Sequence, residues 1–130
     1  MKFAIQINSA PCAGEGSVSA YQFIRAALSL GHEIVRVFFY YEGAYNGSRW
    51  SSPPDDETQT LGRWTELARD HGIDLVICVS AAQRRGLLGP SEVGGLGGQD
   101  EAVADGFRIA GLGLWVEACL KADRFLAFGG

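Results

Sequence analysis

Four short segments of the chain are mostly apolar, and glycine or polar residues separate each of them from the next. The segments at 32–41 and 73–80 are the richest in Val, Ile and aromatic residues, which favour strands. Nearly continuous apolar runs of this length are typical of parallel strands that are buried on both faces. The pattern therefore predicts four strands, over 2–8, 32–41, 73–80 and 123–130.

Between these strands the apolar residues recur at helical spacing. In the first such segment Ser17 or Ser19 can cap the start of a helix, and Gly31 can end it. The apolar face of that helix holds Phe23, Ile24, Ala27 and Leu28. The pattern predicts helices over 17–31, 56–72 and 108–122, and a short helical turn over 81–86.

Strands that alternate with helices form βαβ units and a parallel sheet. We therefore expect an α/β fold of three layers, in which helices flank a mainly parallel sheet. A length of 130 residues fits a single domain, over 1–130. The stretch at 42–56 contains N-G and P-P breaks, and the stretch at 87–106, glycine-rich over 89–98, has no clear period, so both are predicted to be loops.

Composition narrows the class of protein. Apolar residues make up 47% of the chain and charged residues 20%, which is a globular composition. The net charge of −4 argues against electrostatic binding to nucleic acid or to an anionic membrane. No apolar run approaches the roughly 20 residues of a membrane span, and the N-terminus lacks the long apolar region of a signal peptide. We therefore expect a cytoplasmic protein.

The chain has three cysteines, an odd number, and they share no short spacing. This argues against a disulfide framework and against a C-x-x-C metal or redox pair, so at least one thiol should be free. No metal site and no cofactor is predicted. Cys119 falls beside Trp115 and Val116 on the last predicted helix, where we expect a packed core thiol.

Cys78 stands near the end of the strand at 73–80, and catalytic groups of α/β sheets lie at the carboxyl ends of strands. A buried structural thiol and a nucleophile within reach of a partner are both open for this position. Arg84 and Arg85 follow closely, and their charge would stabilise a thiolate or a persulfide, although a solvated surface pair is the alternative. Ser80 can donate a hydrogen bond or cap the next helix.

A nucleophilic cysteine in a hydrolase usually needs a partner base. His32 and His71 each stand beside a glycine at the C-terminal end of a predicted helix, so both belong at the opposite end of the sheet. Chemistry that sulfur performs alone remains, namely thiol exchange or persulfide transport. If the first strand pairs with the third, Cys12 can approach Cys78 as a resolving thiol, and an incidental exposed cysteine is the alternative.

A nucleotide-binding module is a further interpretation of the sequence. Gly14 and Gly16 precede a predicted helix in the loop at 9–17, where backbone N–H groups can cradle an anion. Glu42 follows the second strand, at the place where a ribose-binding acid lies in dinucleotide folds. The loop is not G-x-G-x-x-G, and a flexible connection explains it equally well.

Four segments of the chain resemble one known family: MKFAIQIN, SAYQFIRAALSLGHEIVRVFFYYEG, RWTELARDHGIDLVICVSAAQRRG and FRIAGLGLWVEACLKADRFLAFG. Together they are similar to the DsrE/TusD subunit of the DsrEFH and TusBCD sulfur-relay complexes, of the DsrE/DsrF-like family. The most specific part is CVSAAQRRG at the end of the third strand. The resemblance implies a Rossmann-like α/β fold and a sulfurtransferase whose persulfide-forming cysteine is Cys78.

The resemblance also implies partners. These are two related small subunits, DsrF/TusC-like and DsrH/TusB-like, in a heterohexamer, together with an upstream sulfur carrier and a downstream TusE/DsrC-like acceptor. The sulfur would serve either cytoplasmic sulfur oxidation or 2-thiolation of the tRNA wobble uridine. A non-catalytic assembly subunit with a buried Cys78 remains the alternative, and its interface would use the aromatic stretch VFFYYEGAY and Trp50.

Overall fold

The computed structural model describes residues 1–11, 13–49, 60–87 and 102–129. This part of the chain forms a five-stranded, all-parallel sheet in the order β4-β3-β2-β1-β5. Its strands are β1 (Lys2–Ile7), β2 (Glu33–Phe39), β3 (Leu75–Cys78), β4 (Phe107–Ala110) and β5 (Arg124–Phe128). Its helices are α1 (Gly16–Ser29), the 3-10 helix η1 (Tyr41–Gly47), α2 (Thr60–His71), α3 (Val79–Arg84) and α4 (Gly113–Lys121).

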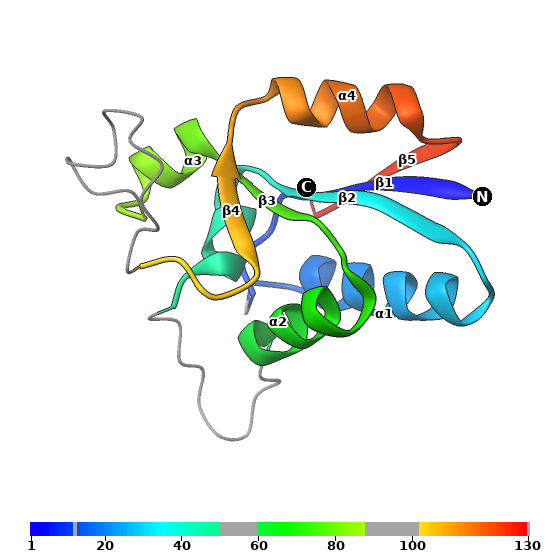
Figure 1. The fold of residues 1–130 in the computed structure, drawn as a ribbon. Helices are drawn as coiled ribbons and strands as arrows, with labels where there is room; N and C mark the ends of the chain where they lie inside the picture. Colours follow the sequence, from blue (N-terminus) through cyan, green and yellow to red (C-terminus); the bar gives the residue numbers. More distant parts are fainter. Residues whose placement is uncertain (12, 50–59, 88–101, 130) are drawn as a thin grey trace.

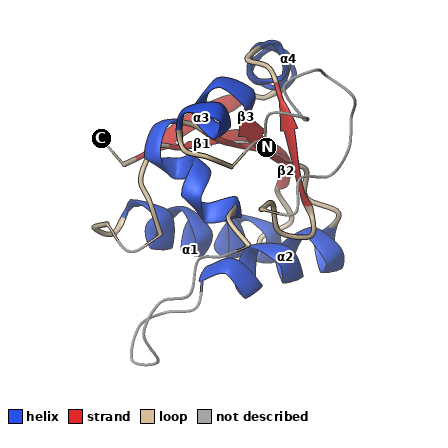
Figure 2. Ribbon diagram, turned by 90° about the vertical axis from the view of Figure 1, so that its left-hand side faces the viewer, coloured by secondary structure: helices blue, strands red, loops and turns tan. Residues whose placement is uncertain are grey.

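The helices cover both faces of the sheet. Helices α1 and α2 lie on one face, and α4 crosses the other face (Figures 1 and 2). Helix α3 follows β3 directly and lies beyond the carboxyl ends of the strands, at the left of Figure 1. The expected three-layer α/β fold with a parallel sheet is confirmed.

Adjacent side chains in β2 show why its second half, Val37–Phe39, is apolar without a break. Phe38 packs against Trp115 of α4, with ring centroids 5.9 Å apart. Phe39 packs against Trp64 of α2 at 5.3 Å. Because neighbouring side chains of a strand point to opposite faces, and both faces are covered, every position from Val37 to Phe39 is fully buried.

The prediction of one helix over 108–122 is wrong at its start. Residues Phe107–Ala110 form β4, which pairs in register with β3, and α4 begins only at Gly113. A four-residue strand is too short to give a period of its own, so the sequence pattern merged it with the helix that follows. Pairing with β3, which the local sequence does not contain, decides its conformation.

The predicted serine cap of the first helix is also wrong. Glu15 is the N-cap residue of α1, and it makes no side-chain capping bond. Ser17 lies inside the first turn, where it is 1% exposed and its hydroxyl donates a 2.6 Å hydrogen bond to Asn46 Oδ1. The predicted stop is confirmed, since Gly31 directly follows the helix C-cap with φ of +86°.

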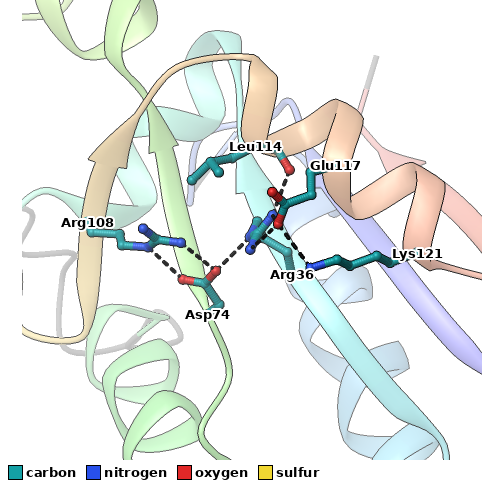
Figure 3. A network of polar contacts seen from close by, with 6 residues as sticks. All are labelled: Arg36, Asp74, Arg108, Leu114, Glu117 and Lys121. Atoms are coloured by element: carbon teal, nitrogen blue, oxygen red, sulfur yellow. Dashed lines mark hydrogen bonds and ion pairs between the residues drawn. The ribbon is translucent and has the colours of Figure 1, made fainter.

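A network of charged side chains fastens α4 to the sheet (Figure 3). Arg36 of β2 donates from Nε to Asp74 Oδ2 at 2.6 Å and from Nη1 to the carbonyl of Leu114 at 2.8 Å. Arg108 of β4 donates two hydrogen bonds of 2.9 Å to the same carboxylate. Glu117 of α4 contacts Arg36 at 3.4 Å. Asp74 therefore holds together two strands whose arginines would otherwise repel.

Asp74→Asn should lower the free energy of unfolding by about 1–3 kcal/mol, because it leaves Arg36 and Arg108 without their shared anion. Denaturant unfolding at neutral pH measures the change. Asp70→Asn is the control, since within the described ranges the Asp70 carboxylate pairs only with exposed Arg69, and its loss should cost much less. Equal effects of the two substitutions would contradict a structural role for the network.

The same variant has a defined pH dependence. Burial raises the pKa of Asp74, but the hydrogen bonds and charges of Arg108 and Arg36 outweigh it, so the pKa lies below its usual value. A carboxyl with a lowered folded-state pKa stabilises the protein above its unfolded pKa of about 4, and this contribution is lost as the pH falls through the folded value. The stability gap between wild type and Asp74→Asn should therefore be constant near neutral pH and shrink in acid.

Candidate active site

Cys78 is the last residue of β3 and the N-cap residue of α3. Its side chain makes no capping hydrogen bond, and the residue is 3% exposed. The predicted position at the carboxyl end of the third strand is confirmed. The thiol is free but buried in the part of the chain that the structure describes, not open at the lip of the sheet.

The residues beside Cys78 follow from the strand register. Ala110 of β4 is its direct partner. On the other side, Tyr40 continues β2 with extended backbone, one residue beyond the Phe39–Ile77 pair, and so reaches the level of Cys78. The Tyr40 ring stacks on Phe38 at 6.2 Å. Apolar and aromatic groups therefore flank the thiol within the sheet.

The 3-10 helix η1 closes the carboxyl edge of the sheet next to Cys78. A Cβ at Gly43 would meet the backbone carbonyl of Ile7, with 2.8 Å to its carbon. A Cβ at Gly47 would meet the side chains of Ile77 and Phe107. Both positions need glycine because backbone passes directly over backbone or over core side chains. Close packing at these two positions seats η1 on β1 and β3.

Asn46 fixes η1 from within and was missed by the sequence analysis. It is 1% exposed, and its amide nitrogen donates to the carbonyls of Ser9 at 3.0 Å and Gly43 at 2.9 Å. Its oxygen accepts the hydrogen bond from Ser17. The sequence pattern predicted a strand up to Tyr41 and a loop from Glu42, because N-G marks turns, whereas β2 ends at Phe39 and η1 begins at Tyr41. The small residues of η1 were the signal that it packs closely on other elements.

The two arginines after Cys78 have different environments. Arg85 is largely buried, with its side chain 16% exposed, and its Nη2 donates to Glu42 Oε1 at 2.6 Å. Its Nη1 donates to the carbonyl of Ala81 at 3.2 Å. The Arg84 side chain is exposed and forms no hydrogen bond or ion pair with the rest of the described chain. The charge of Arg85 is therefore neutralised by Glu42, whereas that of Arg84 has no partner among the described residues.

Glu42 and Ser80 differ from their predicted roles. Glu42 serves as the partner of Arg85, which weakens its assignment as a ribose-binding acid. Ser80 is exposed in the second position of α3, so the predicted cap is wrong, because the helix begins earlier and Cys78 is its N-cap. No side-chain hydrogen bond joins Ser80 to another described residue.

Neither histidine reaches this edge of the sheet. His32 lies between α1 and β2, and His71 ends α2 before β3, so both are at the amino ends of the strands, as predicted. The condition for a Cys12–Cys78 contact is not met, because β2 lies between β1 and β3; Cys12 itself is outside the described residues.

Cys119 lies on α4 and is only partly buried, so the prediction of a core thiol is wrong. Partial burial nevertheless raises the pKa of the Cys119 thiol above its usual value. Its neighbour Val116 is 54% exposed, which places this side of α4 at the surface. Cys119 is therefore a weakly acidic thiol away from the carboxyl edge of the sheet.

The described residues contain no group of three or more His, Cys, Asp or Glu side chains placed to hold a metal ion. In the same part of the chain, no helix is both long and apolar enough to cross a membrane.

Comparison with known proteins now gives the family. The model of the DsrE/DsrF-like family matches residues 1–128. The chain belongs to this family. It is 49% identical over 129 residues to "Putative sulfurtransferase DsrE" of Allochromatium vinosum, and the aligned region covers 99% of each chain. It is 41% identical over 128 residues to "Sulfurtransferase TusD" of Salmonella newport, and the aligned region covers 98% of this chain and 100% of the relative.

A solved structure supports the fold. The crystal structure of the YchN protein of E. coli superposes with a TM-score of 0.78, covering 98% of this chain and 99% of the other. The two sequences are 20% identical, so this likeness concerns the fold. The resemblance to DsrE and TusD inferred from four sequence segments is thus confirmed over nearly the whole chain.

Gly43→Ala should destabilise the protein by about 1–3 kcal/mol, because the added methyl group meets the immobile backbone of Ile7. Thermal unfolding measures the loss. Gly62→Ala is the matched control: nothing lies within 4 Å of its added Cβ, and Gly62 is in α2, where alanine should stabilise by about 0.5–1 kcal/mol. Unfolding transitions that shift in the same direction would contradict the seating of η1 through Gly43.

Proposed function

We propose that the protein is a sulfurtransferase subunit that carries sulfur as a persulfide on Cys78. The observation that supports this most strongly is the position of Cys78 at the junction of β3 and α3, in a chain that aligns end to end with two proteins named as sulfurtransferases. Active groups of parallel α/β sheets lie at this edge. No histidine reaches it in the described chain, which favours sulfur exchange over hydrolysis.

The transfer requires two exchanges at sulfur. The Cys78 thiolate attacks the terminal sulfur of a donor persulfide; a bond forms between Cys78 Sγ and that sulfur, and the donor leaves as a thiolate. An acceptor thiolate then attacks the terminal sulfur on Cys78, forms its own persulfide and releases the Cys78 thiolate. No net oxidation or reduction occurs, and no cofactor is required.

Arg84 is the better candidate of the two arginines for supporting this chemistry from the surface. It is exposed and not paired with another described residue, so its charge is available to an incoming carrier protein. Arg85 already faces Glu42, and Ser80 is an exposed hydroxyl in the first turn of α3. A role for Cys12 as a second thiol is not supported by the strand order.

The partners proposed for this relay are two related small subunits in a heterohexamer, an upstream sulfur carrier and a downstream acceptor of the TusE/DsrC kind. An apolar surface supports association. Leu112, Val116 and Leu120 are 49%, 54% and 82% exposed and recur every four residues along α4. Phe125 on the edge strand β5 is 63% exposed and contacts Trp115. Aligned exposed apolar side chains of this kind mark interaction sites.

The burial of Cys78 favours one alternative, a non-catalytic assembly subunit. At 3% exposure the thiol is as buried as other core residues. In that case the apolar surface of α4 and β5 would be the functional part of the chain, and Cys78 would only pack. The interface predicted at VFFYYEGAY is wrong for Val37, Phe38 and Phe39, which are fully buried, and Trp50 lies outside the described residues. Sulfur loading distinguishes the two functions, because an assembly subunit acquires no persulfide.

Cys78→Ser should abolish sulfur loading, since serine oxygen is not a nucleophile for persulfide exchange. Intact mass spectrometry after incubation with a persulfide donor measures this. The wild type should gain about 32 Da, the mass of one sulfur atom, and Cys78→Ser should not. Cys119→Ser and Cys12→Ser are the controls and should still gain the sulfur. Wild-type protein that never gains this mass, or Cys78→Ser that still gains it, would overturn the carrier function.

Leu120→Asp should weaken binding to the two related small subunits by at least about tenfold, because a charge enters the apolar surface of α4. The folded monomer should tolerate it, since Leu120 is 82% exposed. Co-purification of the three subunits measures the effect. Ser29→Asp is the control, because Ser29 is an exposed residue of α1. Unchanged co-purification would place the interface elsewhere.

A further inference from the structure

The proposed transfer requires that another protein can reach Cys78 Sγ, and in this structure the residue is buried. Attack at sulfur needs an open approach to Cys78 Sγ, yet the residue is 3% exposed. Some segment at the carboxyl edge must therefore move before a carrier protein reaches the thiol. Among the described residues, the segments that follow β2 and β3 are η1 and α3, and both lie at this edge.

One ion pair joins these two segments. Glu42 is the second residue of η1, and Arg85 is the C-cap residue of α3. Their side chains meet at 2.6 Å between Oε1 and Nη2. Arg85 also binds back to the carbonyl of Ala81 in its own helix. The carboxylate of η1 is thereby tied to a guanidinium that is itself anchored to the end of α3.

We propose that Glu42 and Arg85 are positioning residues that hold η1 against α3 and thereby limit access to Cys78. This inference rests on the proposed sulfur-carrier function of Cys78. Separation of the pair frees the start of η1 from α3 and exposes the thiol to a carrier protein. The pair acts on access to sulfur and takes no part in the bonds that form or break.

Two features of the junction between η1 and α3 favour its opening. Arg85 Nε is buried and has no hydrogen-bond partner among the described residues, so the guanidinium is held there without its full set of acceptors. Tyr41, directly before Glu42, has φ of +48°, a conformation that non-glycine residues adopt only when surrounding contacts impose it. The start of η1 is therefore held by tertiary contacts that include this ion pair.

The rest of η1 is fastened independently. Asn46 binds the carbonyl of Ser9 and the hydroxyl of Ser17, and Gly47 accepts a 2.9 Å hydrogen bond from the backbone of Ala104. Loss of the Glu42–Arg85 contact therefore leaves the later half of η1 in place. The expected motion is confined to the first residues of η1 and to α3.

The test is the rate at which iodoacetamide alkylates Cys78 in the folded 130-residue protein, followed by peptide mass spectrometry. Glu42→Gln should raise this rate about three- to tenfold, the change expected from removing one partly exposed ion pair. The rate at Cys119, on α4, is the internal reference and should stay constant. The double variant Glu42→Arg with Arg85→Glu should restore slow alkylation.

Asp105→Asn is the matched control. Asp105 is likewise an exposed carboxylate paired to an arginine, Arg49, that also donates to a backbone carbonyl. Its loss should not change the rate at Cys78. Added salt gives a second readout: it screens the ion pair and should speed alkylation of wild type but not of Glu42→Gln, because iodoacetamide is uncharged.

Sulfur loading, measured in parallel, separates this inference from the carrier function. If Cys78 takes up sulfur but Glu42→Gln alkylates no faster than wild type, the positioning role is wrong and the carrier function stands. If Glu42→Gln alkylates faster but neither protein takes up sulfur, the ion pair controls access and the carrier function is wrong. An equal acceleration by Asp105→Asn would also overturn the positioning role, since it would reflect general loosening.

Discussion

Phe38 and Phe39 are neighbours in β2, and both are fully buried because one packs under α4 and the other against α2. This two-sided burial is the constraint on which the other features depend. It requires layers of helix on both faces, and parallel strands joined through those helices satisfy it. A parallel sheet in turn brings the carboxyl ends of all strands to one edge, which is where Cys78 and η1 lie.

The two ends of the sheet use charge differently. Around Asp74, at the start of β3, two arginines share one carboxylate and clamp α4 to the strands. Around Cys78, at the other end of β3, a single ion pair joins η1 to α3. The first arrangement has several redundant contacts and suits a permanent support. The second contains a single ion pair and suits a junction that opens.

Burial of Cys78 and its proposed chemistry are compatible on this view. A persulfide is readily lost to any accessible thiol, so a covered cysteine protects the sulfur between donor and acceptor. The exposed apolar side chains of Leu112, Val116, Leu120 and Phe125 would give the proposed partner proteins a place to dock on α4 and β5. Docking and access to sulfur would then be separate events on different elements of the fold.

The sequence alone determined the α/β class, a third strand with Cys78 near its end, and the place of both histidines at the opposite edge, because the apolar period of each element is a local property. The predicted bounds 73–80 of that strand were too wide, since β3 is Leu75–Cys78 and α3 begins at Val79. The sequence also carried enough family likeness to indicate sulfur transfer. It failed for β4, whose four residues become a strand only through pairing with β3. It failed equally for Ser17 and Ser80, because helix starts depend on what packs beside them.

Only the tertiary structure separated Arg84 from Arg85 and gave Glu42 a partner 43 positions along the chain. The same holds for Asn46, whose three hydrogen bonds reach Ser9, Ser17 and Gly43. Contacts between segments far apart in sequence leave no periodic trace, so residue type could suggest these groups as candidates but could not assign their partners. The burial of Cys78 was decided in the same way, by segments that meet only in the folded chain.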